Sequence, residues 1–352
     1  MTKHHMLRLF AAGLLAATVV LPALAQESET ADLDAIKTFL LGKTAELTEA
    51  TSELETIARQ YYDLAETADF DYDALAQDAE AAALLLAARD AWIVASPVYE
   101  QMEGIVAGVP SLADYDVTLD AGVSGEEDPV EGVTYNLELL DGRVFERPGN
   151  LFGVTEATLW GTIPDYMSSV WVDLNENGEE DFAEILPDAA VLLAGAEMLT
   201  NVAEELAASA EAWEPTESDA FTALVVMVPT MSEYFGSWKE SRFVAGEDAT
   251  RTDFVAISRL ADIQGILGGL QVVYQSISPR VAAESTDFDS AISDGLVNLH
   301  AYVADLYSSE QDGRVFTAEE ADFYGSEAQD RADNITGQIA QAAALLNIEL
   351  AN

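Results

Sequence analysis

The sequence contains no cysteine, and this absence excludes disulfides, thiolate metal sites, cysteine nucleophiles and a lipid-anchored N-terminal cysteine. Histidine is almost as scarce. His4 and His5 lie near the N-terminus, and His300 lies within an apolar helical pattern. A zinc site of the usual His/Cys type and a Ser-His-Asp triad are therefore not expected. Any metal site must use carboxylate, amide and carbonyl oxygens, which suit Ca²⁺, Mg²⁺, Mn²⁺ or ferric iron.

Basic residues are also few, because 15 Lys+Arg stand against 64 Asp+Glu and give a formal net charge of −49. Such a surface attracts cations and repels nucleic acid and anionic lipid, so no nucleic-acid partner is expected. It also suits a salty environment, where dissolved ions screen the self-repulsion. General adaptation to salt is the alternative that requires no specific ligand. With 49% hydrophobic residues, the 352-residue chain can still bury one large core or two modest ones.

Long apolar runs are absent except at the N-terminus. Residues 1–25 combine a basic start, an apolar run and the small-x-small pattern Ala23-Leu24-Ala25, which is typical of a secretory signal peptide. We expect cleavage near Ala25, before Gln26, and a periplasmic or secreted mature protein. No later segment stays apolar for about 18 residues without a charge, so no membrane span is predicted in the mature chain.

Helical periodicity dominates the rest of the chain. Residues 31–67 and 73–107 read as two long helices with a short join, which predicts an antiparallel bundle. Residues 151–171 are expected to be helical, with interruptions at a glycine and a proline. Further helices are expected at 188–213, at 217–240, from Thr252 or Asp253 to about 283, at 287–308 and at 317–350.

The predicted fold class is therefore all-α, with two helical-bundle halves of long antiparallel helices. The first bundle is expected to comprise about 31–120 and 151–171, and the second about 188–350. Residues 121–150 are rich in glycine and predict an irregular insertion, in which residues 133–145 could form a small hairpin or an extended excursion.

Two carboxylates on one helical turn are the first candidate site. Glu100 and Glu103 are three residues apart near the end of the second helix, so both point the same way. Nearby aromatic and apolar residues such as Tyr99 indicate partial burial, and an acidic loop that ends at Asp120 follows. Together these groups can surround a hard cation with oxygen ligands. The alternative is a solvated acidic face.

The strongest local motif is DLNENGEEDFAE at 173–184, which fits the calcium-binding loop of an EF-hand. The side-chain ligands would be Asp173, Asn175, Asn177, Asp181 and Glu184, with the backbone carbonyl of Glu179. Glu180 stands where a paired loop carries an apolar residue, so an isolated calcium loop is expected; a polar turn without metal is the alternative. A weaker match runs from Ser308 to Glu319, where Ser308 is a poor first ligand.

Four stretches, in order over most of residues 35–350, resemble the imelysin-like family, which includes EfeO/EfeM-type periplasmic components of bacterial iron uptake. ARDAWIVASPVYEQMEGIVAGVPSLADYDVTLD resembles the family's Y-E-x-I-E helix with its following acidic loop. NLFGVTEATLWG resembles the family's H-x-x-E segment. GEDATRTDFVAISRLADIQGILGGL resembles the start of the family's S-H-T-D helix. SSEQDGRVFTAEEADFYGSEAQDRADNITGQIAQAAALL resembles its closing D-G-F helix, which weakens the second calcium-loop interpretation.

The resemblance implies an all-helical fold with a cleft between two halves and a metal site. Carried over by position, the family's acidic ligands fall on Glu100, Glu103, Asp120 and Glu156. Its motif histidines fall on Gly153 and Arg251, and their loss argues against peptidase activity.

The function expected from these patterns is the binding of iron or another hard cation by carboxylates in an interhelical cleft. Metal ions and an iron permease system are the implied partners. One alternative is a binding or structural protein whose family site has lapsed and which keeps a structural Ca²⁺. A metallopeptidase is the alternative with the least support.

Overall fold

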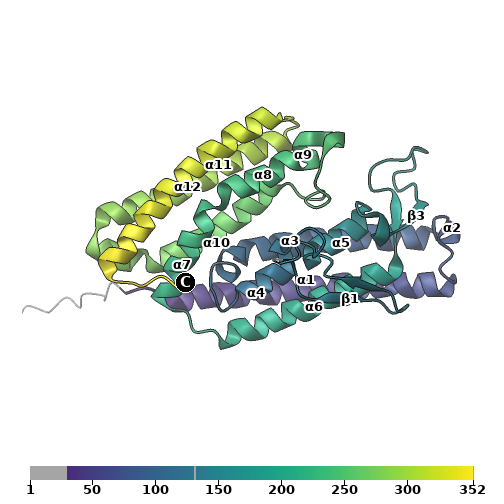
Figure 1. The fold of residues 1–352 in the computed structure, drawn as a ribbon, viewed down its shortest axis with the longest axis horizontal. Coiled ribbons are helices and arrows are strands. Elements are labelled where there is room, and N and C mark those ends of the chain that lie inside the picture. The colour runs from purple at the N-terminus through teal and green to yellow at the C-terminus, as the bar shows by residue number, and fades with distance from the viewer. Residues whose placement is uncertain (1–29, 131, 352) are drawn as a thin grey trace, which may run out of the picture.

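The computed structural model describes residues 30–130 and 132–351, and within them the protein is mainly α-helical (Figure 1). The long helices are α1 (Leu33–Thr67), α3 (Ala79–Val106), α6 (Ala189–Ala212), α10 (Arg259–Glu284), α11 (Thr286–Gln311) and α12 (Ala318–Leu346). The shorter ones are α2 (Tyr72–Leu75), α4 (Ala113–Asp116), α5 (Leu151–Trp160), α7 (Glu217–Met227), α8 (Met231–Glu240) and α9 (Arg242–Ala245). The predicted all-α fold is confirmed. The predicted signal peptide at 1–25 lies outside the described residues.

The first bundle is built around α1, which packs against α3 on one side and α6 on the other. Its buried Leu40, Leu47 and Leu54 recur every seven residues, so they form one continuous apolar face. Helix α5 lies against α6. The sequence pattern had placed 188–213 in the second bundle, whereas α6 packs in the first. An apolar face shows that a helix is buried without showing which neighbour covers it.

The second bundle contains α7, α8, α10, α11 and α12, with α12 lying along both α8 and α11. Helix α10 packs on α11 and also on α3, so it lies between the two halves (Figure 1). Glycines allow the close approach of α3 and α10. A Cβ on Gly269 would lie only 2.2 Å from the backbone oxygen of Gln101, and one on Gly265 would lie 3.0 Å from Cβ of Glu100.

Two small hairpins interrupt the helices. Strands β1 (Asn136–Glu138) and β2 (Val144–Glu146) pair antiparallel inside the predicted irregular insertion. Strands β3 (Met167–Trp171) and β4 (Ile185–Pro187) form the second hairpin. The helical prediction for 151–171 is therefore wrong beyond Trp160. Gly161 adopts a left-handed conformation (φ 67°) that ends α5, and the chain continues into β3.

The start of α10 also differs from the prediction. Ser258, not Thr252 or Asp253, caps this helix, and its side chain accepts a hydrogen bond from the backbone N–H of Leu260. Residues 250–258 form a non-helical segment that crosses to the first bundle. The reason is a tertiary contact with Glu156, described below, which no local sequence signal encodes.

Helix α3 is the one described helix that is long and apolar enough to cross a membrane by length and composition. In this fold it is a core helix packed between α1 and α10. Its residues Leu85, Tyr99 and Met102 are completely buried. Apolar residues of the helix that satisfies the membrane criterion therefore belong to the core of the protein.

Candidate metal centre

A buried acidic cluster lies where the end of α3 meets the start of α10. Glu100 and Glu103 come from α3, Asp116 from α4, Asp120 from the π-helical turn Val117–Ala121, and Asp262 from the first turn of α10. Each of these five residues is less than one-tenth exposed. Glu100, Glu103 and Asp120 each offer an oxygen within 4.8 Å of the other two. The structure thus brings together three of the four predicted family ligands.

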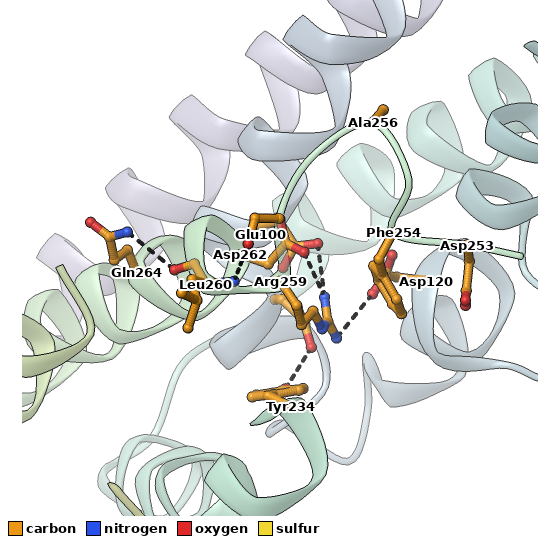
Figure 2. A network of polar contacts seen from close by, with 12 residues as sticks. Glu100, Asp120, Tyr234, Asp253, Phe254, Ala256, Arg259, Leu260, Asp262 and Gln264 are labelled. Carbon is orange, nitrogen blue, oxygen red and sulfur yellow. Dashed lines mark hydrogen bonds and ion pairs between the residues drawn. The ribbon is translucent and has the colours of Figure 1, made fainter. Parts of the chain in front are cut away.

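Arg259 extends into this cluster from the first position of α10 (Figure 2). Its Nη1 lies 3.4 Å from Glu100 and 3.3 Å from Asp262, and its Nη2 lies 3.9 Å from Asp120. The guanidinium also lies over two aromatic rings, 4.3 Å from the centre of Phe254 and 4.5 Å from that of Tyr234. Three of the five carboxyl groups in the cluster therefore contact one buried guanidinium.

Two tyrosines complete the polar contacts of the cluster. The hydroxyl of Tyr234 donates to Glu103 at 2.9 Å, and that of Tyr99 donates to Asp116 at 2.7 Å. The second oxygens of Glu100 and Glu103, both Oε2, are buried and accept no hydrogen bond. Buried acceptors without a partner are rare in folded proteins, so these two atoms need a physical explanation.

Burial changes the protonation of the cluster. It raises the pKa of Asp120 and of Asp262 to about 7 each, against the opposing effect of the Arg259 guanidinium. Burial also raises the pKa of Glu100 and of Asp116 well above the usual range, with added repulsion from neighbouring carboxylates. Without a further cation, the cluster therefore retains protons at a pH where exposed carboxyl groups have lost theirs.

Glu156, the fourth predicted ligand, has a different role in the fold. Its carboxylate accepts the backbone N–H groups of Phe254 at 2.8 Å and of Val255 and Ala256 at 2.9 Å. Burial raises the pKa of Glu156 to about 8, although these hydrogen bonds act in the opposite direction. Glu156 is therefore not part of the triad of converging oxygens. It holds the segment before α10, and with it the ring that lies against Arg259.

An open cleft of about 390 Å³ leads to the cluster, and its walls come from both halves of the molecule. Glu103 and Asp120 line it from the first half, and Tyr234 and Arg259 from the second. The positions onto which the family's histidines fall, Gly153 and Arg251, also line this cleft. Arg251 is paired with Asp253 through two contacts of 2.7 and 2.6 Å.

The segment at residues 173–184, the calcium-like loop, forms the tip of the β3–β4 hairpin. Asp173 accepts the backbone N–H groups of Asn177 and Gly178, and Glu184 accepts those of Leu174, Asn175 and Asp181. The side-chain amides of Asn175 and Asn177 both donate to Asp181. Gly178 has a φ of 78°, as the sharp turn predicted there requires. The predicted ligand residues thus share one turn between two strands, and none of them lines the cleft at the acidic cluster.

Two further features concern calcium. The guanidinium of Arg242 lies over the ring of Phe182 in the loop at 173–184, with its Cζ 3.7 Å from the ring centre. Arg242 belongs to α9, which packs on α8, so the loop touches the second half. The weaker candidate from Ser308 to Glu319 is not one loop, because 308–311 form the last turn of α11 and α12 begins at Ala318.

The sequence patterns did not identify Arg259, Asp262 or Tyr234 as site residues. Arg259 and Asp262 are three residues apart, and Arg259 directly follows Ser258, a residue type that commonly caps helices. That spacing is a usable signal only when the helix start is placed correctly, and the predicted N-cap, Thr252 or Asp253, is five or six residues too early. Tyr234 comes from α8, and no local pattern links it to α3.

Comparison with known proteins places the chain in a family. No curated protein matches it. The family model described as Imelysin (Peptidase M75) matches residues 54–345, a range that contains most of both bundles and the whole acidic cluster. Since this match covers most of the chain, the protein belongs to the imelysin family.

Proposed function

We propose that this imelysin-family protein binds a hard metal cation with Glu100, Glu103 and Asp120. The observation that carries the proposal is the pair of buried oxygens without hydrogen-bond partners, Oε2 of Glu100 and Oε2 of Glu103. Both belong to the triad whose oxygens converge within 4.8 Å. Buried charge is tolerated when it is paired or coordinates a metal, and a cation would satisfy both oxygens at once.

The donor set supports a hard cation. Every candidate ligand in the triad is a carboxylate, and such oxygens suit Ca²⁺, Mg²⁺, Mn²⁺ and ferric iron. The cluster carries five carboxyl groups against one arginine, so added positive charge would relieve their mutual repulsion. Glu103 and Asp120 also line the open cleft, which would give an ion a path to the site.

The biological setting belongs to the same proposal. The signal-like pattern of residues 1–25 supports export to the periplasm or beyond. The family and the oxygen-only ligand set support a role in iron uptake, with an iron permease system as partner. Because the cluster has no histidine and its one cation is Arg259, we propose that the protein is not a peptidase.

A titration of residues 26–352, stripped of metal with a chelator, tests the metal site. We predict that Glu100→Gln/Glu103→Gln weakens binding of Mn²⁺ or Fe³⁺ by at least about 100-fold, because the variant removes the negative charge of both carboxylates that carry an unpartnered oxygen. The measurement is isothermal calorimetry. The control is Asp63→Asn/Glu66→Gln, an exposed acidic pair on α1 with the same spacing, which should bind as the unmodified protein does.

Equal binding by the double variant and the unmodified protein would contradict the proposal. It would favour the alternative in which the family site has lapsed. Casein cleavage by the protein after loading with Mn²⁺ would separately contradict the non-peptidase assignment, provided that the Glu100→Gln/Glu103→Gln variant is inactive.

We also propose that the loop at 173–184 binds a structural Ca²⁺. The EF-hand spacing supports this, as does the turn in which the structure places the predicted ligands. The contact of Phe182 with Arg242 gives such an ion a structural consequence, because a fixed loop would hold the hairpin against the second half.

Removal of the loop's first and last ligands tests the second site. We predict that Asp173→Ala/Glu184→Ala abolishes Ca²⁺ binding and the rise in melting temperature that Ca²⁺ produces, while Mn²⁺ binding at the acidic cluster remains. The control is Glu179→Gln, because position 7 of the motif would use its backbone carbonyl and not its side chain. Retention of Ca²⁺ binding in the double variant would refute the loop assignment.

A further inference from the structure

Arg259 is buried in an unfavourable position for a cation. It is the first residue of α10, where the partial positive charge of the helix terminus repels a guanidinium. Only 5% of it is exposed, so water does little to stabilise its charge. The surrounding carboxylates must therefore hold it there, which makes Arg259 the internal counter-charge of the cluster.

The contacts that hold Arg259 are loose for buried ion pairs. Its distances of 3.3, 3.4 and 3.9 Å exceed the roughly 2.7–2.9 Å of a strong charged hydrogen bond. Its Nε is buried and has no partner. Arg251, in the same cleft, instead makes a two-point contact of 2.7 and 2.6 Å with Asp253. The geometry at Arg259 is that of a group shared among several acids and bound firmly to none.

Two of the three proposed metal ligands are the same groups that hold Arg259. Glu100 and Asp120 contact its guanidinium (Figure 2). Glu103 instead accepts a hydrogen bond from Tyr234. A metal ion bound to this triad would lie close to the guanidinium, and the two positive charges would repel each other in a buried site. The carboxylates therefore cannot serve both cations fully.

We propose that Arg259 is a tethered counter-cation that competes with the metal for Glu100 and Asp120 and thereby sets the affinity of the site. The inference rests on the proposed metal-binding function. The rings of Phe254 and Tyr234 allow the exchange, because they can keep the guanidinium in cation–π contact when the carboxylate contacts are lost. Arg259 also lines the open cleft, so its side chain has space into which it can move.

Neutralisation of Arg259 is the direct test. Binding of Mn²⁺ is followed by the electron paramagnetic resonance signal of the free ion, with Asp173→Ala/Glu184→Ala in all proteins so that the calcium-like loop does not contribute. We predict that Arg259→Gln binds Mn²⁺ at least about tenfold more tightly, because the competing charge is gone. Arg314→Gln is the control, with the same substitution at an exposed arginine outside the cleft, between α11 and α12, and it should stay within about threefold of the parent.

The outcomes separate this inference from the proposed function. Tighter binding by Arg259→Gln supports competition, and equal or weaker binding by the folded variant overturns it. If the parent binds no Mn²⁺ but Arg259→Gln does, the native metal function fails while the competition is upheld. If neither protein binds any, both proposals fail, since no cation competes with the arginine.

A folding control keeps the test decisive. Circular dichroism shows whether Arg259→Gln retains the helical fold. If it does not, Arg259→Met takes its place, because methionine removes the charge and keeps an unbranched side chain against the rings of Phe254 and Tyr234. Tighter Mn²⁺ binding is again expected, and unchanged or weaker binding by the methionine variant would overturn the inference.

Discussion

The carboxyl groups of Asp120 and Asp262 show at the residue scale how burial changes a side chain. An exposed aspartate has a pKa near 4, whereas burial raises the pKa of each of these two groups to about 7. Arg259 opposes the rise in both cases. The residues therefore behave as weak acids near neutral pH, although their type alone indicates permanent charge.

This shift predicts that stability depends on pH. Because the folded pKa exceeds the unfolded value, the two groups stabilise the fold fully below about pH 4, and this contribution is lost as the pH rises through about 7. We expect the melting temperature of the metal-free protein to fall between pH 5 and pH 8. It should fall less in Asp262→Asn, where one of the groups no longer titrates. Thermal melts monitored by circular dichroism check this.

The comparison with the variant matters because other groups titrate in the same range. Burial lowers the pKa of His300, which acts in the opposite direction as the pH rises. An identical pH profile in Asp262→Asn and the unmodified protein would contradict the assignment of the effect to the cluster.

At the residue scale, sequence patterns could predict part of the site. The spacing of Glu100 and Glu103 places both on one turn of α3, and the acid at position 120 follows within reach. Glu156 lies near them, but its carboxylate accepts hydrogen bonds from the backbone N–H groups of residues 254–256. Arg259 could not be predicted, because its role depends on where α10 begins and on which helix it faces.

The crossing of α3 and α10 is the decisive contact at the scale of elements. It holds Glu100 on one helix opposite Arg259 on the other, and Gly269 permits it. We predict that Gly269→Ala destabilises the protein by about 1–3 kcal/mol, because the new Cβ would collide with the backbone of α3 and separate the helices. Urea denaturation followed by circular dichroism gives the free energy of unfolding.

The neighbouring glycine is the matched control for this prediction. A Cβ on Gly268 would meet no atom within 4 Å. Because alanine favours the helix over glycine, Gly268→Ala should stabilise the protein by up to about 1 kcal/mol. Loss of stability in Gly268→Ala as well, or no loss in Gly269→Ala, would contradict the assignment of the effect to the close crossing.

Element boundaries were predictable where the signals were local. The polar break after α1, the hairpin in the irregular insertion and the limits of α6 agree with the sequence patterns. The strand β3 was missed because residues 167–171 resemble the end of a helix once the left-handed Gly161 is overlooked. The late start of α10 reflects hydrogen bonds to Glu156 across nearly a hundred residues of chain, which no window along the sequence contains.

For the whole molecule, the sequence predicted the class of fold better than the arrangement of the helices. Periodicity indicated bundles of long helices, and the lack of cysteine and histidine limited the candidate centre to oxygen ligands. The partition into halves differed, because α6 packs with α1. A net charge of −49 makes docking of two acidic halves costly unless the cations at their interface are well placed.

The cleft with walls from both halves has a consequence for how the protein acquires its site during folding. Glu100, Glu103 and Asp120 precede Arg259 and Tyr234 in the chain, so an N-terminal half that folds first holds its carboxylates open to water. They lose that water only when α10 docks and brings Arg259 with it. Docking and charge compensation are then a single late event, and the arrival of Arg259 marks the completion of the fold.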